Sequence, residues 1–271
     1  MSGLVINIDP VIIHVGHFAL RWYSVFIVLA VVAAVLISAR QAKKNGLAGE
    51  VIYSMTPWLL VAGIVGARLF HVIDKWSYYA ANPALIFQVQ QGGLAIWGAL
   101  VGGAIALFAF ARARHLPLAR LLDVLVPGLL VAQIIGRFAC IVNGDAAGSL
   151  TTLPWGFIYV NPEAMVPAGL AGVPTHPYPV YEMLWNGASL LLLLKLRGRL
   201  KADGALFFGY VGLYSLGRLV LTFVRQEAVW FWGLQEAQVV SIILMAASTA
   251  LLVFRLRRSR PATAAREGVS E

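Results

Sequence analysis

The sequence predicts an all-α integral membrane protein with seven transmembrane helices, the N-terminus outside and the C-terminus in the cytoplasm. Hydrophobic residues make up 60% of the 271 residues and charged residues only 12%, and the mean hydropathy is +0.79. This composition lies outside the range of soluble globular proteins. Apolar stretches long enough to cross a bilayer, which takes about 20 residues, recur along the chain.

Seven such stretches can be marked: 18–39, 54–73, 93–112, 121–142, 179–195, 204–224 and 237–256. The first is neither preceded by a charged region nor followed by a small-residue cleavage site, so we expect a retained span rather than a cleaved signal peptide. The fifth is the shortest. We expect residues 1–256 to form a single membrane domain.

Two further segments complete the expected organisation. Residues 143–178 contain five prolines and no long periodic run. We expect them to form an outer loop or a small cap over the site, with a structureless surface loop as the alternative. Residues 257–271 are expected to form a disordered, basic cytoplasmic tail.

The basic residues of the loops give the orientation. Fifteen Lys and Arg residues follow the first, third, fifth and seventh stretches, whereas the alternate loops hold only Lys75 and Arg225. Short cytoplasmic loops collect Lys and Arg, so the N-terminus is predicted outside. The net charge of +9 then marks the cytoplasmic face and its attraction to anionic lipids, and no nucleic acid is needed to explain it.

Four arginines, Arg21, Arg68, Arg137 and Arg218, lie within or at the edge of apolar stretches. An arginine at mid-bilayer costs at least ~2.5 kcal/mol, so such residues usually face a protein interior or a wet cavity. At 1.5 Å of rise per residue, the predicted topology places all four roughly 5–10 Å below the outer surface, the depth of phospholipid phosphates. We interpret them as an anionic-headgroup site. The alternative is that their long side chains snorkel to the interface.

Glycines lie near these arginines in the sequence and recur in the third stretch. Gly66, Gly136 and Gly217 stand near an arginine, and small residues there allow close helix packing or leave room for a ligand. For Gly98 and Gly102, within the third stretch, we favour helix packing.

Cys140 is the single cysteine, which excludes an intramolecular disulfide and a cysteine metal cluster. We interpret it as a small, weakly polar residue that faces a neighbouring helix. The five histidines form no plausible ligand cluster, so we expect no metal and no cofactor.

Seven segments carry a resemblance over nearly the whole chain. In order they are DPVIIHVGHFALRWY at 9–23, GARLFHVI at 66–73, QQGGLAIWGALVGG at 90–103, GRFACIVNGDAAG at 136–148, PWGFIY at 154–159, HPYPVYE at 176–182 and GRLVLTFVR at 217–225. With the seven-span topology, they resemble the bacterial prolipoprotein diacylglyceryl transferase family.

The match at family site positions is incomplete. The matching residues are Tyr23, Arg137, Asn143, Gly148, Tyr181, Glu182, Arg218 and Arg225. Where the family often has histidine this chain has Trp97, and where the family often has asparagine it has Cys140. At two positions where the family often has glutamate, this chain has Asp145 and Thr222. The phosphate-holding residues are therefore better matched than the acid–base residues.

The resemblance implies an enzyme that moves the diacylglyceryl group of phosphatidylglycerol to the lipobox cysteine thiol of a secreted prolipoprotein. A thioether forms and glycerol phosphate leaves. The implied partners are phosphatidylglycerol, signal peptides with a lipobox cysteine and membrane lipid. The implied location is the bacterial plasma (inner) membrane, as a multi-pass protein, and we expect a monomer.

Arg137 and Arg218 suit the leaving phosphate, because guanidinium is always charged and binds phosphate oxygens in bidentate fashion. Fixed donors that meet charge growing in the transition state accelerate the reaction. The other residues expected to bind phosphatidylglycerol are Arg68, Asn143, Gly148, His176, Tyr181 and Arg225. The remaining catalytic candidates, as proton acceptors for the thiol, are Tyr23, Asp145 and Glu182.

Two alternatives to an active transferase remain. A lipid or small-anion transporter could use the same arginines, although no internal repeat is evident and the charges stop in the outer half. A degenerate family member could bind lipid or precursor without turnover, which the four departures allow.

Overall fold

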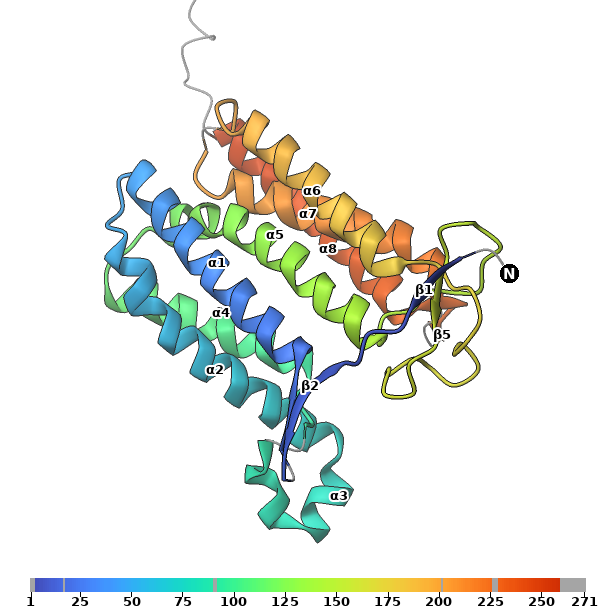
Figure 1. Ribbon diagram of the computed structural model, residues 1–271. Coiled ribbons are helices and arrows are strands. Elements are labelled where there is room, and N and C mark those ends of the chain that lie inside the picture. The colour runs from blue at the N-terminus through green and yellow to red at the C-terminus, as the bar shows by residue number, and fades with distance from the viewer. Residues whose placement is uncertain (1–2, 17, 90–91, 201, 226–228, 259–271) are drawn as a thin grey trace, which may run out of the picture. The chain divides into compact units, whose positions relative to one another are not determined.

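The computed structural model describes residues 3–16, 18–89, 92–200, 202–225 and 229–258 (Figure 1). Most of the tail expected at 257–271 therefore lies outside the described residues. The fold is mostly helical. The contacts divide the chain into two compact units, one of residues 38–124 and one of residues 1–37 with 125–271, and each is described by itself.

The described residues contain seven helices of 17 residues or more. They are α1 (Trp22–Lys44), α2 (Glu50–Asp74), α4 (Ile96–Ala113), α5 (Leu118–Asn143), α6 (Tyr178–Leu196), α7 (Ala205–Leu221) and α8 (Glu236–Arg258). Among the described residues, six helices are long and apolar enough to cross a membrane, and α6 is not one of the six. The prediction of a helical, multi-pass membrane protein is confirmed at this level.

Two predicted spans begin too early in the sequence. The stretch 18–39 starts within β3 (Phe18–Arg21), which pairs with β2 (Val11–Val15) in an antiparallel ladder, so the helix begins only at Trp22. The stretch 93–112 starts at Gly93, whose φ of 72° is not helical, and α4 begins at Ile96. Hydropathy alone does not locate the start of α1 at Trp22 or of α4 at Ile96.

In the unit of residues 38–124, α2 and α4 approach each other through glycines. A Cβ on Gly66 would lie 2.3 Å from the Gly98 carbonyl oxygen, and a Cβ on Gly102 would lie 2.2 Å from that of Ala62. The helix-packing interpretation is confirmed for Gly98 and Gly102, because any side chain there would force the backbones apart. The short α3 (Trp76–Ala81) and the 3-10 helix η1 (Pro83–Phe87) follow α2.

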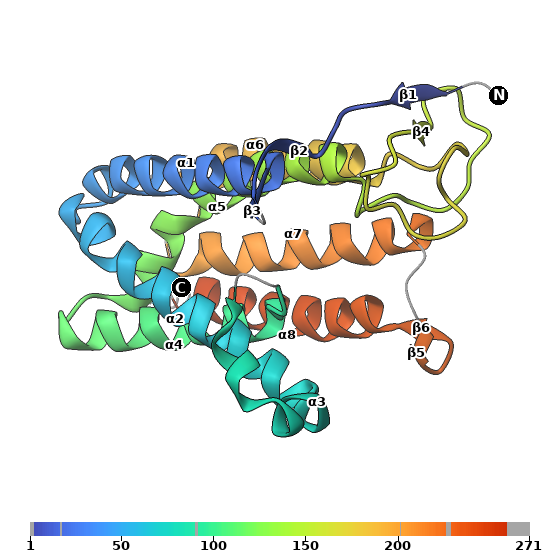
Figure 2. The same ribbon diagram turned by 60° about the horizontal axis from the view of Figure 1, so that its bottom comes forward.

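In the larger unit, α7 lies beside both α6 and α8 (Figure 2). Trp185 of α6 fits against Gly217 of α7, where a Cβ would lie 2.1 Å from the indole nitrogen. That nitrogen donates a hydrogen bond of 2.9 Å to the Leu213 carbonyl. This contact fixes α6 against α7 immediately beside Arg218. Apolar side chains from α5, α6 and α7 form a buried cluster of Val126, Leu130, Leu193 and Leu206.

The segment after α5 has a small core of its own. Its strand β4 (Phe157–Tyr159) pairs in parallel with β1 (Leu4–Ile6) near the N-terminus. The side chains of Ala147, Phe157, Tyr159 and Leu170 form a buried cluster. Residues 143–178 thus pack around apolar side chains despite their five prolines. The remaining strands, β5 (Val229–Phe231) and β6 (Leu234–Gln235), form a hairpin before α8.

Candidate active site

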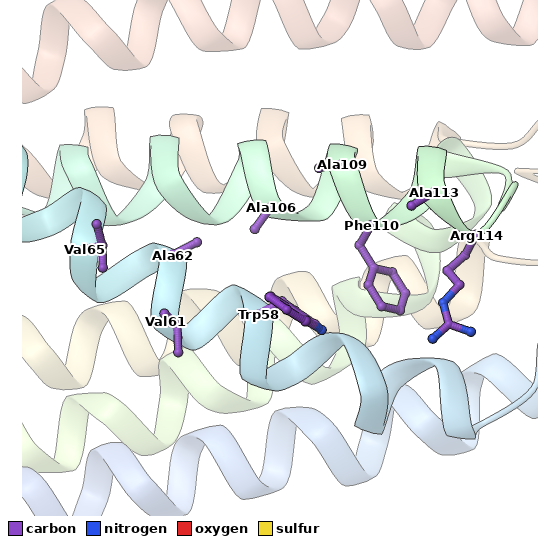
Figure 3. A pocket seen from close by; sticks show the side chains of 9 residues that line it. All are labelled: Trp58, Val61, Ala62, Val65, Ala106, Ala109, Phe110, Ala113 and Arg114. Atoms are coloured by element: carbon purple, nitrogen blue, oxygen red, sulfur yellow. The ribbon is translucent and has the colours of Figure 1, made fainter.

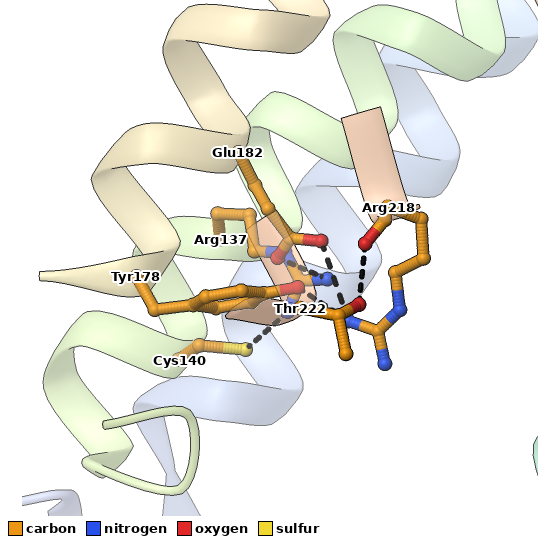
Figure 4. A network of polar contacts seen from close by, with 6 residues as sticks. All are labelled: Arg137, Cys140, Tyr178, Glu182, Arg218 and Thr222. Carbon is orange, nitrogen blue, oxygen red and sulfur yellow. Dashed lines mark hydrogen bonds and ion pairs between the residues drawn. The ribbon is translucent and has the colours of Figure 1, made fainter. Parts of the chain in front are cut away.

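A carboxylate joins two of the intramembrane arginines (Figure 4). Glu182 on α6 places Oε2 at 2.5 Å from Arg137 Nη2 of α5, and Oε1 at 3.7 Å from Arg218 Nη1 of α7. Glu182 is buried, whereas the side chains of Arg137 and Arg218 keep 23% and 20% of their exposure. One carboxylate against two guanidinium groups leaves a formal positive charge that an anionic ligand can reach.

Tyr178 supports the same cluster. It lies four residues before Glu182 and therefore on the same face of α6. Its hydroxyl accepts a hydrogen bond from Arg218 Nη1. Its ring centroid lies 5.9 Å from Cζ of Arg218 and 5.0 Å from Cζ of Arg225, within cation–π range. Sequence reasoning missed this residue.

Cys140 also contacts the cluster. Arg137 Nη1 donates a long hydrogen bond of 3.6 Å to Cys140 Sγ, one turn further along α5. The interpretation of Cys140 as a small helix-facing residue is correct as to its burial but omitted this contact. Arg137 therefore bridges a carboxylate and a thiol.

Tyr23 and Asp145 lie at the edge of this site. Both are exposed, and the charge of Asp145 acts electrostatically on Tyr23 and Cys140. Asp145 also affects Tyr159 in β4, where burial chiefly, and the carboxylate in addition, raise the pKa of the phenol above its ordinary value. Asp145 is thus an acidic side chain that solvent reaches beside Tyr23, Tyr159 and Cys140.

Asn143 and Gly148 flank Asp145 in the chain. Asn143 is buried; its amide nitrogen approaches Met165 Sδ at 3.4 Å, and its Oδ1 is buried without a hydrogen-bond partner in the described part of the chain. A Cβ on Gly148 would lie 2.8 Å from the carbonyl oxygens of both His176 and Val224. Glycine there lets three backbone segments meet.

His176 and Tyr181 contact each other at the start of α6. The Tyr181 hydroxyl lies 3.2 Å from His176 Nδ1, and Trp155 Nε1 donates to the same hydroxyl at 3.1 Å. The structure thus brings together His176 and Tyr181, both expected from the sequence. It adds the indole of Trp155, which was not expected.

Thr222 and Trp97 are two of the positions at which this chain departs from the family pattern. Thr222 is fully buried, and its hydroxyl donates to the Arg218 carbonyl at the end of α7. This hydrogen bond joins Thr222 to the last turn of α7. Trp97 lies in α4, within the unit of residues 38–124.

Arg68 also belongs to the unit of residues 38–124. It is buried, and its guanidinium donates to the carbonyls of Leu85, Ile86, Gln88, Gly92 and Gly93. Its Cζ lies 5.0 Å from the centroid of the Tyr79 ring. These contacts account for the burial of its charge, because each backbone carbonyl supplies an acceptor.

Comparisons with known proteins place the whole chain in one family. A family model described as prolipoprotein diacylglyceryl transferase matches residues 10–254. The chain is similar to proteins named phosphatidylglycerol–prolipoprotein diacylglyceryl transferase from three bacteria. It is 38% identical to that of Dehalococcoides mccartyi strain CBDB1 (94% of this chain, 96% of the relative). It is 31% identical to that of Lysinibacillus sphaericus (97% and 97%) and 33% identical to that of Listeria welshimeri (96% and 95%).

Proposed function

The chain belongs to the prolipoprotein diacylglyceryl transferase family, and from this premise we propose that it transfers the diacylglyceryl group of phosphatidylglycerol to a lipobox cysteine of secreted prolipoproteins. The observation that supports this most directly is the cluster of Arg137, Glu182 and Arg218. It combines fixed cations with a partly open position, as an enzyme that releases a phosphate ester requires.

The arginines act on the leaving group. The substrate thiolate attacks the glyceryl carbon, the carbon–oxygen bond breaks, and its electron pair passes to the phosphate oxygen. The phosphate therefore gains negative charge in the transition state. Arg137 and Arg218, already fixed by Glu182 and Tyr178, meet that charge without reorganisation. Arg225, stacked on Tyr178, adds a third positive charge.

The remaining site residues recognise the headgroup. The unpaired Oδ1 of buried Asn143 can accept a hydrogen bond from a glycerol hydroxyl of phosphatidylglycerol. His176 and Tyr181 offer a second hydrogen-bonding pair, and Gly148 permits close backbone approach.

Arg68 was also expected to bind phosphatidylglycerol. Because its hydrogen bonds go to backbone carbonyls, we assign it instead to supporting the segment after α2.

Asp145 suits the role of proton acceptor better than Glu182 does. The Glu182 oxygens already face two guanidinium groups, whereas Asp145 is exposed and acts electrostatically on Tyr23 and Cys140. Positive charge from the arginines also favours the thiolate, since a cysteine pKa of about 8.5 falls beside cations. We propose Tyr23 as a neighbour that positions the incoming thiol.

We further propose that α6 is a seventh span of one monomeric domain, residues 1–256, in the bacterial inner membrane. Three observations support the assignment of α6 as a span. The helix is continuous over 19 residues, its polar residues Glu182, Asn186 and Ser189 are buried, and Lys195 stands in its last turn. Burial removes the polar side chains from lipid, and Lys195 can reach the interface. Seven spans put the two termini on opposite sides, and the basic loops then favour an outside N-terminus.

Reporter fusions test this topology. A reporter active only in the cytoplasm should work when fused after Lys44, Arg114 or Arg199, because basic loops stay inside. It should be silent when fused near Ser77 or Gly169. Activity at Gly169 would reverse the assignment of residues 143–178, and of the adjoining site, to the outer side.

A transfer assay tests the function itself. Purified protein with phosphatidylglycerol and a lipobox peptide should yield a peptide heavier by one diacylglyceryl group, measured by mass spectrometry. The matched peptide with serine in place of cysteine should stay unmodified, because an alcohol gives almost no anion at neutral pH. A transporter would move lipid between leaflets without changing the peptide, and a degenerate binder would retain an unmodified peptide. Either result with folded protein would refute the proposal.

A further inference from the structure

An apolar groove runs along α2 and α4 within residues 38–124 (Figure 3). Its volume is about 570 Å³, within the range of small-molecule sites. Small side chains leave the space: Ala62 of α2 lies near Ala106 of α4, and Ala109 and Ala113 continue the α4 side toward Arg114. Trp58 and Val61, exposed at 66% and 61%, form the α2 side. The groove therefore offers apolar surface with room for a chain.

A second cavity, with two charged residues and a serine in its lining, adjoins the groove. It has a volume of about 400 Å³ and is lined by Glu50, Val51, Ser54, Phe110, Arg114 and Leu116. Phe110 and Arg114 line both cavities. In the described part of the chain, neither Glu50 nor Arg114 forms an ion pair, although they line one pocket. A cation and an anion thus face one space without neutralising each other directly.

The dimensions fit one lipid in one leaflet. From Glu50 to Val65 the two cavities follow α2 for 15 residues, or roughly 22 Å at 1.5 Å per residue. Half of a bilayer, headgroups included, is about 20–22 Å thick. Glu50 and Arg114 adjoin loops predicted to be cytoplasmic, whereas Arg137 and Arg218 are predicted in the outer half.

We propose that these two cavities bind one phosphatidylethanolamine molecule as a structural lipid distinct from the substrate. The phosphate pairs with Arg114, the ammonium donates hydrogen bonds to Glu50, and an acyl chain lies in the groove. The zwitterionic headgroup matches the one positive and one negative side chain of the pocket. Phosphatidylcholine lacks N–H donors, and phosphatidylglycerol lacks the cation that Glu50 would balance. The site goes beyond the proposed function and does not depend on turnover.

Native mass spectrometry of the delipidated full chain tests this. The protein is mixed with phosphatidylethanolamine, phosphatidylcholine and phosphatidylglycerol of identical acyl chains, and the retained lipids are counted. Phosphatidylethanolamine should be retained about two- to fivefold more than phosphatidylcholine, the size expected of partly exposed ion pairs. Comparing these two lipids leaves the substrate out of the measurement, so the outcome is independent of the transferase activity.

Matched variants locate the site. Arg114→Ala should lower phosphatidylethanolamine retention about two- to fivefold, whereas Arg112→Ala, two residues earlier at the same helix end, should not. Glu50→Gln should abolish the preference over phosphatidylcholine, with Glu163→Gln as control. Ala109→Leu should fill the groove and reduce retention, whereas Ala104→Leu, outside the lining, should have no effect. Circular dichroism establishes that each variant is helical.

Three results would overturn the proposal. Equal retention of phosphatidylethanolamine and phosphatidylcholine would remove the role of Glu50. Unchanged retention in Arg114→Ala would remove the phosphate contact. Loss of phosphatidylglycerol alone in Arg114→Ala would show a site for anionic lipid instead.

Discussion

Arg137→Lys should reduce diacylglyceryl transfer at least ~10²-fold, the loss seen when one fixed donor to a developing anion is removed. Lysine keeps the positive charge but lacks the planar fork by which Arg137 reaches Glu182 with Nη2 and Cys140 with Nη1. A single ammonium group cannot hold both partners and the phosphate. The measurement is the rate of peptide lipidation by purified variant and parent protein.

The control for this variant is Arg40→Lys, the same exchange near the end of α1, which should retain nearly full activity. Helical circular dichroism and detergent-solubilised yield should match the parent for both. Near-normal turnover by Arg137→Ala would show that the phosphate is held elsewhere.

Glu182→Gln should lower both activity and stability. The exchange leaves Arg137 and Arg218 close together without their shared carboxylate. Breaking a fully buried ion pair costs about 3–5 kcal/mol, and the partial exposure of both arginines reduces this to roughly 2–3 kcal/mol. With the guanidinium groups no longer fixed, transfer should fall at least ~10²-fold. Thermal unfolding in detergent and the transfer rate measure the two effects.

Glu163→Gln, in the loop before α6, removes the same charge from an exposed position and should change neither property. If the Glu182→Gln variant had the same unfolding temperature as the parent protein and kept its turnover, the carboxylate would have no part in positioning the arginines. A loss of turnover alone, with unchanged stability, would favour Glu182 as the proton acceptor over Asp145.

The sequence predicted the helices well because lipid imposes a simple requirement. A span must be apolar over about 20 residues, so hydropathy located α5 as 121–142 against the observed Leu118–Asn143. The helix starts at Trp22 and Ile96 were missed because a strand pairing and a glycine backbone conformation determine them. The pairing of β1 with β4 joins residues more than 150 positions apart, which no local pattern reveals.

The site was predicted where charge stands out against apolar sequence. Arg137 and Arg218 were found because an arginine is costly in a membrane helix, and Glu182 because an acid follows HPYPVY. Tyr178 was missed because a tyrosine near a helix start is unremarkable until Arg218 and Arg225 are seen against it. The carbonyl partners of Arg68 were also missed, because they come from η1 and the segment after it, 17 to 25 residues away in the sequence.

The central claim is that the Arg137–Glu182–Arg218 cluster stabilises the phosphate that leaves during transfer. The most direct test uses phosphatidylglycerol labelled in its glycerol headgroup and counts labelled glycerol phosphate released per lipobox peptide modified. For the parent protein we expect one glycerol phosphate per diacylglyceryl group added, and for Arg137→Ala and Arg218→Ala a loss of both products together, with the proteins still folded. Modified peptide without stoichiometric glycerol phosphate, or full release by both folded arginine variants, would contradict the account.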